Sequence, residues 1–282
     1  MKHGEIFHGH QLEDPRECHG IITGSDPSVL LLHHHPAVIR LARPDGPNTV
    51  FKVFGSPYSQ FQGNWAFGYD TSHATALWDQ IPLDTDIVVT HTPAHSYCDQ
   101  KPMGRSLGCD VLRQRLSRVR PQLAICGHVH EGWGYERVRW QSTRNSAGGE
   151  SVDVDTVIRG DLPCPGSKKQ CLIDLTGRWA KRLDNEGFSC SIPAATGPAS
   201  TTSVGSSANK VLESTDRYIS SFRSPPPGVS NHAFYHSLQT LRRETCFINA
   251  SIMATSWPHA GGKRFNRPIV VDIELPVWQS ET

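Results

Sequence analysis

The alternation of apolar and polar residues predicts a strand over residues 49–58, which ends in a turn at Gly55 and Pro57. Aromatic side chains crowd the stretch that follows this turn. They are Trp65, Phe67, Tyr69 and Trp78. A packed aromatic cover over a sheet is the favoured interpretation of these rings, and a ligand-stacking site is the alternative.

The next three hydrophobic patterns predict a β-α-β unit. Residues 86–90 contain a continuous β-branched run, which is typical of a strand buried on both faces of a parallel sheet. Residues 108–119 place apolar side chains at helical spacing, and residues 123–126 are a second short buried run. Because the two strands of such a right-handed unit run parallel, their carboxyl ends emerge at the same edge of the sheet.

Three histidines directly follow these two predicted strands. His91 comes after the first strand, and His128 and His130 lie in a Gly-His-x-His segment after the second. Ligand sites in open α/β sheets gather at this edge, so we expect the three imidazoles in one neighbourhood. Imidazole nitrogens suit Zn, Fe and Mn, and the pattern therefore predicts a metal site.

The second half of the chain changes in composition. Residues 141–230 are rich in Ser, Thr, Gly, Pro and Asn, which predicts a largely disordered insertion. Within it, residues 171–175 have the pattern of an isolated strand whose partner the sequence does not indicate. Residues 233–242 are expected to be helical, and residues 246–252 and 268–273 are expected to be strands that pair with each other.

Composition and charge limit the class of protein. The 282 residues include 28 Lys and Arg against 27 Asp and Glu, a net charge of +1 that does not favour a nucleic-acid partner. No apolar run is long enough to cross a membrane, and the first residues are not a secretory signal. The eight cysteines are scattered, as in a reducing compartment. We therefore expect a cytoplasmic protein without a membrane span, of undetermined oligomeric state.

Other polar residues have weaker claims to function. His33, His34 and His35 precede Pro36 and are interpreted as a solvated run without a role. The predicted helix has a basic face that consists of Arg113, Arg115, Arg118 and Arg120. This face is expected to be solvated, and contact with an anionic substrate is the alternative. The loop after His91 contains three candidates for the mouth of a pocket, which are His95, Cys98 and Asp99. Of these, His95 and Asp99 are the substrate-binding candidates.

Several longer segments are distinctive. They are residues 54–58 (Phe-Gly-Ser-Pro-Tyr), 64–67 (Asn-Trp-Ala-Phe), 77–82 (Leu-Trp-Asp-Gln-Ile-Pro), 85–93 (Thr-Asp-Ile-Val-Val-Thr-His-Thr-Pro), 120–134 (with Gly-His-Val-His) and 247–251 (Phe-Ile-Asn-Ala-Ser). Together they resemble the calcineurin-like metallophosphoesterases, and especially a small subfamily of brain metallophosphoesterase-domain proteins and their fungal relatives. The resemblance covers residues 50–140 and 240–275.

The resemblance implies roles for the three histidines. In that family one cation of a two-metal site is held by the residues that correspond to His91 and His128, and His130 would serve the other cation. His128 is also the expected catalytic residue. The metals of the family are Mn, Fe or Zn, and the substrate is a small phosphoester.

This chain departs from the family in the amino-terminal motifs. It lacks the Asp-x-His, the bridging Gly-Asp and the Gly-Asn-His, because Gly63-Asn64 is followed by Trp65 and Gly160-Asp161 lies in the low-complexity region. Three neutral imidazoles without a bridging carboxylate do not offset two divalent charges. We therefore expect one weakly bound cation or none, and slight or no hydrolysis by these 282 residues alone.

The resulting prediction is an α/β protein. The resemblance implies a two-sheet sandwich flanked by helices that lacks its first βαβαβ part, with Met1 as an internal methionine of a longer protein. Residues 1–140 and 231–282 are expected to form one metallophosphoesterase-type domain around the insertion at 141–230. The expected function is phosphodiester hydrolysis in the complete form, and the alternative is a catalytically inactive binding or regulatory protein.

Overall fold

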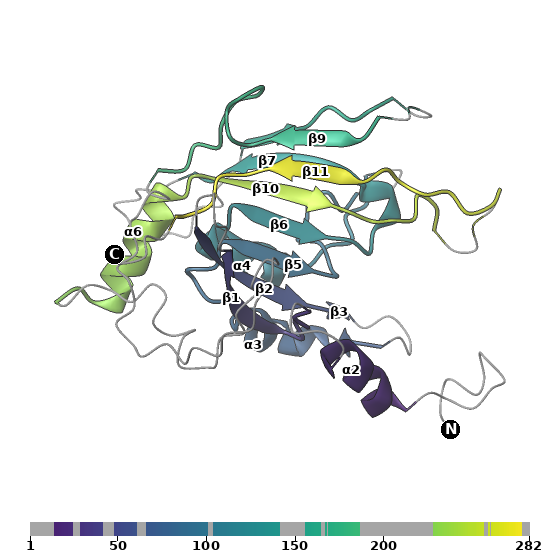
Figure 1. Ribbon diagram of the computed structural model, residues 1–282, viewed down its shortest axis with the longest axis horizontal. Coiled ribbons are helices and arrows are strands. Elements are labelled where there is room, and N and C mark those ends of the chain that lie inside the picture. Colours follow the sequence, from purple (N-terminus) through teal and green to yellow (C-terminus); the bar gives the residue numbers. More distant parts are fainter. Residues whose placement is uncertain are drawn as a thin grey trace, which may run out of the picture.

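A mixed sheet of seven strands is the centre of the computed structural model of this chain (Figure 1). The structure describes residues 14–24, 29–41, 48–60, 66–100, 104–141, 156–164, 167, 169–186, 228–256, 259 and 261–277. In spatial order the strands are β1 (His35–Leu41), β2 (Thr49–Ser56), β5 (Ile87–Thr90), β6 (Leu123–Cys126), β10 (Glu244–Asn249), β7 (Gly134–Arg139) and β8 (Thr156–Arg159). The four strands β2, β5, β6 and β10 are parallel, so their carboxyl ends share one edge.

The predicted β-α-β unit is confirmed. It consists of β5, helix α4 (Asp110–Val119) and β6, and the two strands pair in parallel with Val88 opposite Ala124. The helix begins after Cys109, whose sulfur accepts a hydrogen bond from the backbone of Leu112, and it ends at Arg120 in the left-handed conformation. This unit directs the loops after β5 and β6 toward the same edge of the sheet.

Both faces of β10 are covered. Successive residues of a strand point to opposite faces, and neighbouring residues of β10 belong to two different clusters. Phe247 of β10 packs in the cluster that contains Trp78 and Leu116, from helices α3 (Ala74–Trp78) and α4. Its neighbour Ile248 packs in a second cluster with Ile173 of strand β9 (Cys171–Asp174). All six residues of β10 are buried as a result.

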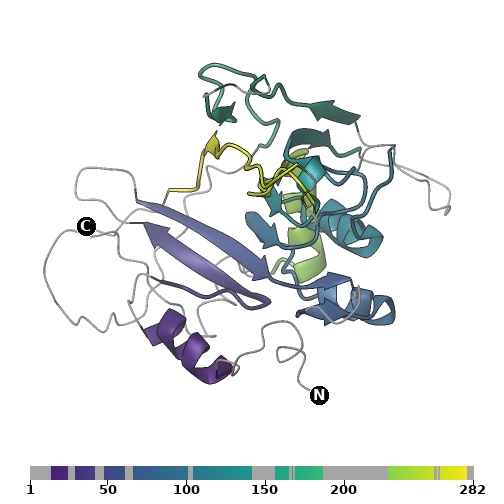
Figure 2. The same cartoon turned by 90° about the vertical axis from the view of Figure 1, so that its right-hand side faces the viewer.

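The second cluster lies under a small parallel sheet that consists of β9 (Cys171–Asp174) and β11 (Ile269–Asp272) (Figures 1 and 2). The prediction of a strand at 171–175 is confirmed. The prediction that residues 246–252 and 268–273 pair with each other is wrong, since β10 pairs with β6 and β7 while β11 pairs with β9. β10 has two buried faces and fits the centre of the large sheet, whereas every second residue of β11 is exposed.

The remaining elements are short or lie at the periphery. They are α2 (Pro15–Gly24), β3 (Ser59–Gln60), β4 (Gly68–Tyr69), η1 (Thr71–His73), η2 (His130–Gly132) and α6 (Asn231–Leu241). β8 and β9 come from the segment 141–230, while residues 142–155 and 187–227 of that segment lie outside the described part of the chain. No helix among the described residues has the length and hydrophobicity to cross a membrane.

Two of the described aromatic residues, Tyr69 and Trp78, are buried as the favoured interpretation expected, whereas Phe67 is 49% exposed. Trp78 is fully buried, and its indole nitrogen donates a hydrogen bond to the hydroxyl of Tyr69 at 3.2 Å. Trp65 lies outside the described residues. The interpretation of the histidine run as solvated is wrong for His34, whose ring lies 5.1 Å from that of Phe54 and is half-buried. This part of the chain leads into β1, a strand that the sequence did not predict.

Buried charges gather at the edge opposite the histidines. The ammonium of Lys52 lies 2.5 Å from the carboxylate of Asp84, and the guanidinium of Arg242 lies 2.8 Å from that of Asp86. At most 4% of any of these four side chains is exposed. Asp86 also accepts a hydrogen bond from the backbone of Lys52 at 2.8 Å. Each charge is therefore paired, as buried charges need to be, and the pairs connect β2 and β5 with the start of β10.

Candidate metal-binding edge of the sheet

The carboxyl edge of the parallel strands brings together loops that are far apart in sequence (Figure 1). His91 follows β5, and its backbone N–H donates to the carbonyl of Ser56 at the end of β2. His128 and His130 follow β6. The backbone N–H of Gly127 donates to the carbonyl of His91 at 3.2 Å. The topology predicted from the sequence therefore puts these residues in contact.

His91 and His128 form a pair. The Nε2 atom of His91 and the Nδ1 atom of His128 are 3.0 Å apart, and the ring centroids are 4.8 Å apart at an interplanar angle of 69°. One of the two nitrogens carries the proton of this hydrogen bond. His91 reaches solvent on one side, but shielding of its ring by the surrounding protein lowers the pKa of His91 below its usual value, and the nearby His130 adds to this effect.

The ring of His130 contacts the loop after β10. Its Nδ1 atom lies 3.0 Å from the backbone carbonyl oxygen of Thr255. Because a carbonyl only accepts hydrogen bonds, Nδ1 carries the proton and the lone pair of the neutral ring is on Nε2. Metal-binding histidines in proteins usually donate their second N–H to such a carbonyl, so the Nε2 atom of His130 has the arrangement of a ligand nitrogen.

The backbone at His128 is strained. Its φ angle is +64°, a left-handed conformation that side chains other than glycine rarely adopt. The N–H of Val129 donates across His128 to the carbonyl of Gly127 at 2.7 Å, which closes a three-residue turn with a positive central φ, a form that is rare and strained. Strain of this kind is typically retained at functional sites. The turn is what brings the ring of His128 to His91.

The fit of a cation to these residues is incomplete. Two nitrogens at about 2.05 Å from one tetrahedral cation are about 3.3 Å apart, which is close to the 3.0 Å between His91 and His128. Within the described ranges, however, no group of three or more His, Cys, Asp or Glu side chains is arranged to hold a metal ion. The described residues thus provide two corners of a coordination sphere and no bridging carboxylate.

The loop after His91 contains the other predicted site residues. The Nδ1 atom of His95 lies 2.9 Å from the hydroxyl of Ser96 and 3.1 Å from a carboxylate oxygen of Asp110. Cys98 is buried, and burial is the main reason why the pKa of its thiol is raised well above the usual range. Roles for these residues at the mouth of a pocket stay predictions.

Asp99 is fully buried, and its carboxylate shapes the loop. It accepts hydrogen bonds from the backbone of Ser96 at 3.1 Å, from the backbone of Gly108 at 2.8 Å and from the hydroxyl of Ser106 at 2.9 Å. All of these donors belong to the loop and the start of the helix region. A substrate-binding role for Asp99 stays a prediction, and the contacts in the structure are those of a residue that organises the loop.

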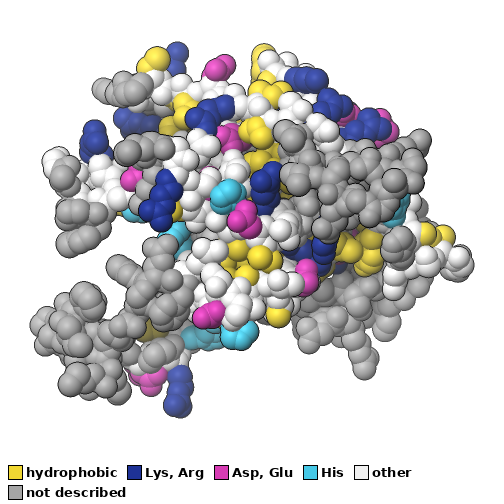
Figure 3. Space-filling model, turned by 180° about the vertical axis from the view of Figure 1, so that it is seen from behind, with side chains coloured by type: hydrophobic (Ala, Val, Ile, Leu, Met, Phe, Trp, Pro, Cys, Tyr) yellow, Lys and Arg dark blue, Asp and Glu magenta, His cyan; other side chains and the backbone are white. Residues whose placement is uncertain are grey.

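The basic face of α4 is not simply solvated. Arg115 donates to the carbonyl of Ile81 and forms an ion pair of 3.2 Å with Asp79, and Arg120 donates to the carbonyl of Gln239 at 3.0 Å. These side chains therefore connect the helix to its neighbours. Charged side chains of both signs are scattered over the face seen in Figure 3, in line with a net charge of +1.

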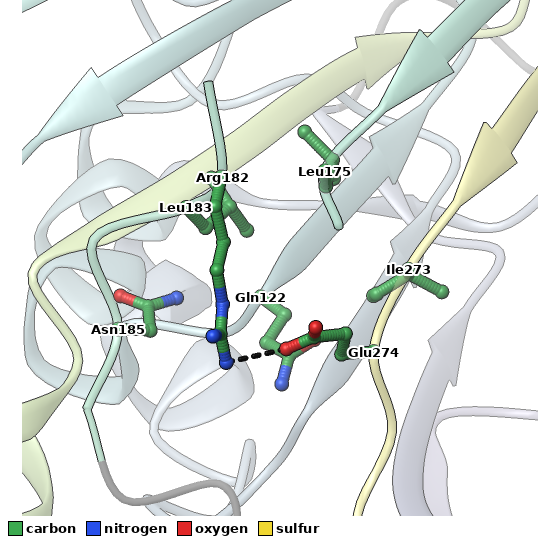
Figure 4. Close-up of a pocket in the computed structure, with 7 residues that line it drawn as sticks. All are labelled: Gln122, Leu175, Arg182, Leu183, Asn185, Ile273 and Glu274. Carbon is green, nitrogen blue, oxygen red and sulfur yellow. Dashed lines mark ion pairs between the residues drawn. The ribbon is translucent and has the colours of Figure 1, made fainter. Parts of the chain in front are cut away.

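Two cavities of the described structure are lined by residues other than the three histidines. One cavity of about 20 Å³, lined among others by the ion pair of Arg182 and Glu274 (Figure 4), has room for about one water molecule. A groove of about 370 Å³ beside the small sheet is lined by residues that include Tyr135 and Trp179.

Asn249 and Ser251 are residues of this edge that the analysis of the sequence did not assign. Both are buried, and the amide of Asn249 contacts the loops after β5 and β6. Both residues belong to the Phe-Ile-Asn-Ala-Ser segment, one of the segments that resemble the metallophosphoesterases. Their position at the end of a buried strand is the sequence feature that could have indicated a role in the site.

Comparison with known proteins gives partial matches. A protein named metallophosphoesterase domain-containing protein 1 of Homo sapiens is 34% identical over 87 residues, which are 30% of this chain and 27% of that protein. A UPF0046 protein of Caenorhabditis elegans is 34% identical over 84 residues, 29% of this chain and 21% of that protein. The matched segment is similar to this small metallophosphoesterase-domain group. No family model matches the chain.

A further relative has a different name. The "Probable rhamnogalacturonate lyase C" of Emericella nidulans is 43% identical over 115 residues, which are 40% of this chain but only 10% of that protein. This chain thus spans between 10% and 27% of the length of the three relatives described. A name given to a protein of which a tenth is shared is not transferred to this chain.

Proposed function

We propose that this chain carries the histidine side of a metal-dependent phosphoester-hydrolysing site of the calcineurin-like type. The observation that carries the proposal is the pair of His91 and His128, with ring nitrogens 3.0 Å apart at the carboxyl edge of a parallel sheet and a strained backbone at His128. A divalent cation there supplies electrophilic polarisation of a phosphoryl oxygen. Because the described ligands are incomplete, no catalytic step is assigned to them.

The architecture supports the same proposal. A metallophosphoesterase-type sandwich needs a second sheet against the first, and the β9–β11 sheet shares a buried cluster with β6 and β10. The proposal that residues 1–140 and 231–282 form one domain is supported by the position of β10, which lies between β6 and β7. A cytoplasmic location is proposed as well, since every described cysteine is a free thiol.

The alternative function is that of a non-catalytic binding or regulatory protein. Two observations favour it: the chain lacks the carboxylate motifs that bridge two cations, and the described residues contain no complete group of metal ligands. Under this alternative the histidines would bind no cation at a concentration of physiological relevance. The two functions differ in a property that can be measured on the purified chain.

Calorimetric titration with Zn²⁺ and with Mn²⁺ separates the two functions. We expect one weakly bound cation, with binding abolished in His91→Asn and in His128→Asn and unchanged in His73→Asn, an exposed histidine of η1. Binding that is absent, or that survives both site variants, contradicts the metal-site proposal and favours the alternative. Hydrolysis of a bis-aryl phosphodiester is expected to be slight or nil, and an ordinary enzymatic rate would contradict the incompleteness of the site.

A further inference from the structure

Asn249, the last residue of β10, joins loops from three parts of the chain. Its side chain is fully buried. The Nδ2 atom donates to the carbonyl of Cys98 in the loop after β5 at 2.9 Å and to the carbonyl of Val129 in the loop after β6 at 2.8 Å. The Oδ1 atom accepts from the backbone N–H of Ser251 at 3.0 Å and from its hydroxyl at 2.7 Å.

The chemistry of these partners determines how the amide is oriented. The two carbonyls can only accept, so they require the NH₂ group, and the backbone N–H of Ser251 requires the oxygen. Both hydrogens of Nδ2 and both lone pairs of Oδ1 are then used. Aspartate has nearly the same shape but no donor, and it would bring a negative oxygen against two carbonyl oxygens.

One of these contacts acts directly on the strained turn. Val129 lies between His128 and His130, is 1% exposed, and has its carbonyl bound by Asn249 and, at 3.4 Å, by the hydroxyl of Ser251. A residue with a positive φ persists only where the surrounding structure holds it. The hydrogen bonds to the Val129 carbonyl hold the peptide between Val129 and His130, which directly follows the three-residue turn, and so contribute to this restraint.

We propose that Asn249 is the positioning residue of the histidine site: its amide holds the turn at His128 in the conformation that places the ring of His128 on His91. The effect on a cation rests on the function proposed above, whereas the placement of the two rings does not. Ser251 assists, because its hydroxyl binds both Asn249 and the Val129 carbonyl.

The test compares Asn249→Asp and Ser251→Ala with a matched control at the other end of the same strand. Asn185 also exchanges two hydrogen bonds with β10, through Glu244 at 2.9 and 2.8 Å, but lies at the edge opposite the histidines. Asn185→Ala therefore removes a comparable anchor of β10 and leaves the histidine loops intact. Far-UV circular dichroism verifies that each variant is folded.

The first measurement is the ¹H–¹⁵N spectrum of the imidazole nitrogens without added metal. We expect the signals of His128 and His91 to shift in Asn249→Asp, to shift less in Ser251→Ala, and to stay in place in Asn185→Ala. Should Asn249→Asp fail to fold, Ser251→Ala decides the question. His128 signals that stay unchanged in every folded variant of Asn249 and Ser251, or that move equally in the control, would overturn the proposal.

The second measurement is Zn²⁺ affinity by calorimetry. Loss of a partner that orients metal ligands commonly weakens binding about 10- to 100-fold, and we expect a decrease of this size in Asn249→Asp and no change in Asn185→Ala. If the unmodified chain binds no Zn²⁺, the metal-site proposal fails, while the imidazole spectra still decide whether Asn249 positions the rings. If Zn²⁺ binds equally to the chain and to folded Asn249→Asp, the positioning proposal fails and the metal site stands.

Discussion

Replacing Arg242 by Met tests how strongly the buried charges hold the edge of the sheet opposite the histidines. The guanidinium donates to a carboxylate oxygen of Asp86 at 2.8 Å and to the carbonyl of Thr85 at 2.7 Å. Because the donor of both bonds is the charged guanidinium, each contributes about 1.5–3 kcal/mol. The sum agrees with the loss of about 3–5 kcal/mol expected when one partner of a buried ion pair is removed.

Urea denaturation followed by circular dichroism measures this loss. With a denaturant slope of about 3 kcal/mol per molar, the midpoint is expected to fall by about 1–1.7 M. Arg139→Met is the control, because its ion pair with Asp184 is exposed, with 45% and 26% of the two side chains accessible, and should contribute at most about 1 kcal/mol. A loss in Arg242→Met no larger than in Arg139→Met would refute the reasoning.

Three further predictions concern packing, the site and pH. Trp78→Ala should lower the free energy of unfolding by about 3–5 kcal/mol in the same urea assay, because the buried indole leaves a cavity. Gly132→Ala should shift the His128 imidazole signals, because a Cβ there would lie 2.9 Å from the Nδ2 atom of Asn249 and closer still to the Cys98 carbonyl; unchanged signals would contradict this. Burial raises the pKa of the Cys246 thiol to about 12, so between pH 8.5 and 10 the thiol ionises in the unfolded chain and stays protonated in the folded one. The free energy of unfolding should therefore fall as the pH rises through this range. In Cys246→Ala, urea denaturation should show a smaller fall over the same range.

The elements predicted correctly are those whose patterns have one explanation. The β-branched run before His91 and the short run before Gly127 are neighbouring parallel strands, and the arginine-rich stretch between them is a helix with a single apolar stripe. Pairing was harder to predict, since β10 and β11 both look like short strands. Only the tertiary structure shows that one has two covered faces and the other a single covered face.

β1 was missed because the histidines before it were interpreted as solvated. The half-buried ring of His34 packs among aromatic rings and bridges the hydroxyl of Ser56 at 2.9 Å and the carbonyl of Leu77 at 3.2 Å. A polar side chain at the start of a strand gives no periodic signal when its partners come from other segments. The same reason applies to Arg242, whose burial depends on Asp86, a residue far away in the sequence.

The candidate site also has features that the sequence predicts and features that depend on contacts made only after folding. The neighbourhood of His91 and His128 could be predicted because the direction of parallel strands is a property of the β-α-β unit. The positive φ of His128 and the restraint by Asn249 could not, because both depend on which carbonyl lies within hydrogen-bond distance after folding. A strained histidine turn is maintained by hydrogen bonds from a strand more than a hundred residues later in the chain. The geometry of these imidazoles is therefore a property of the assembled sheet edge and cannot be encoded in the Gly-His-x-His segment alone.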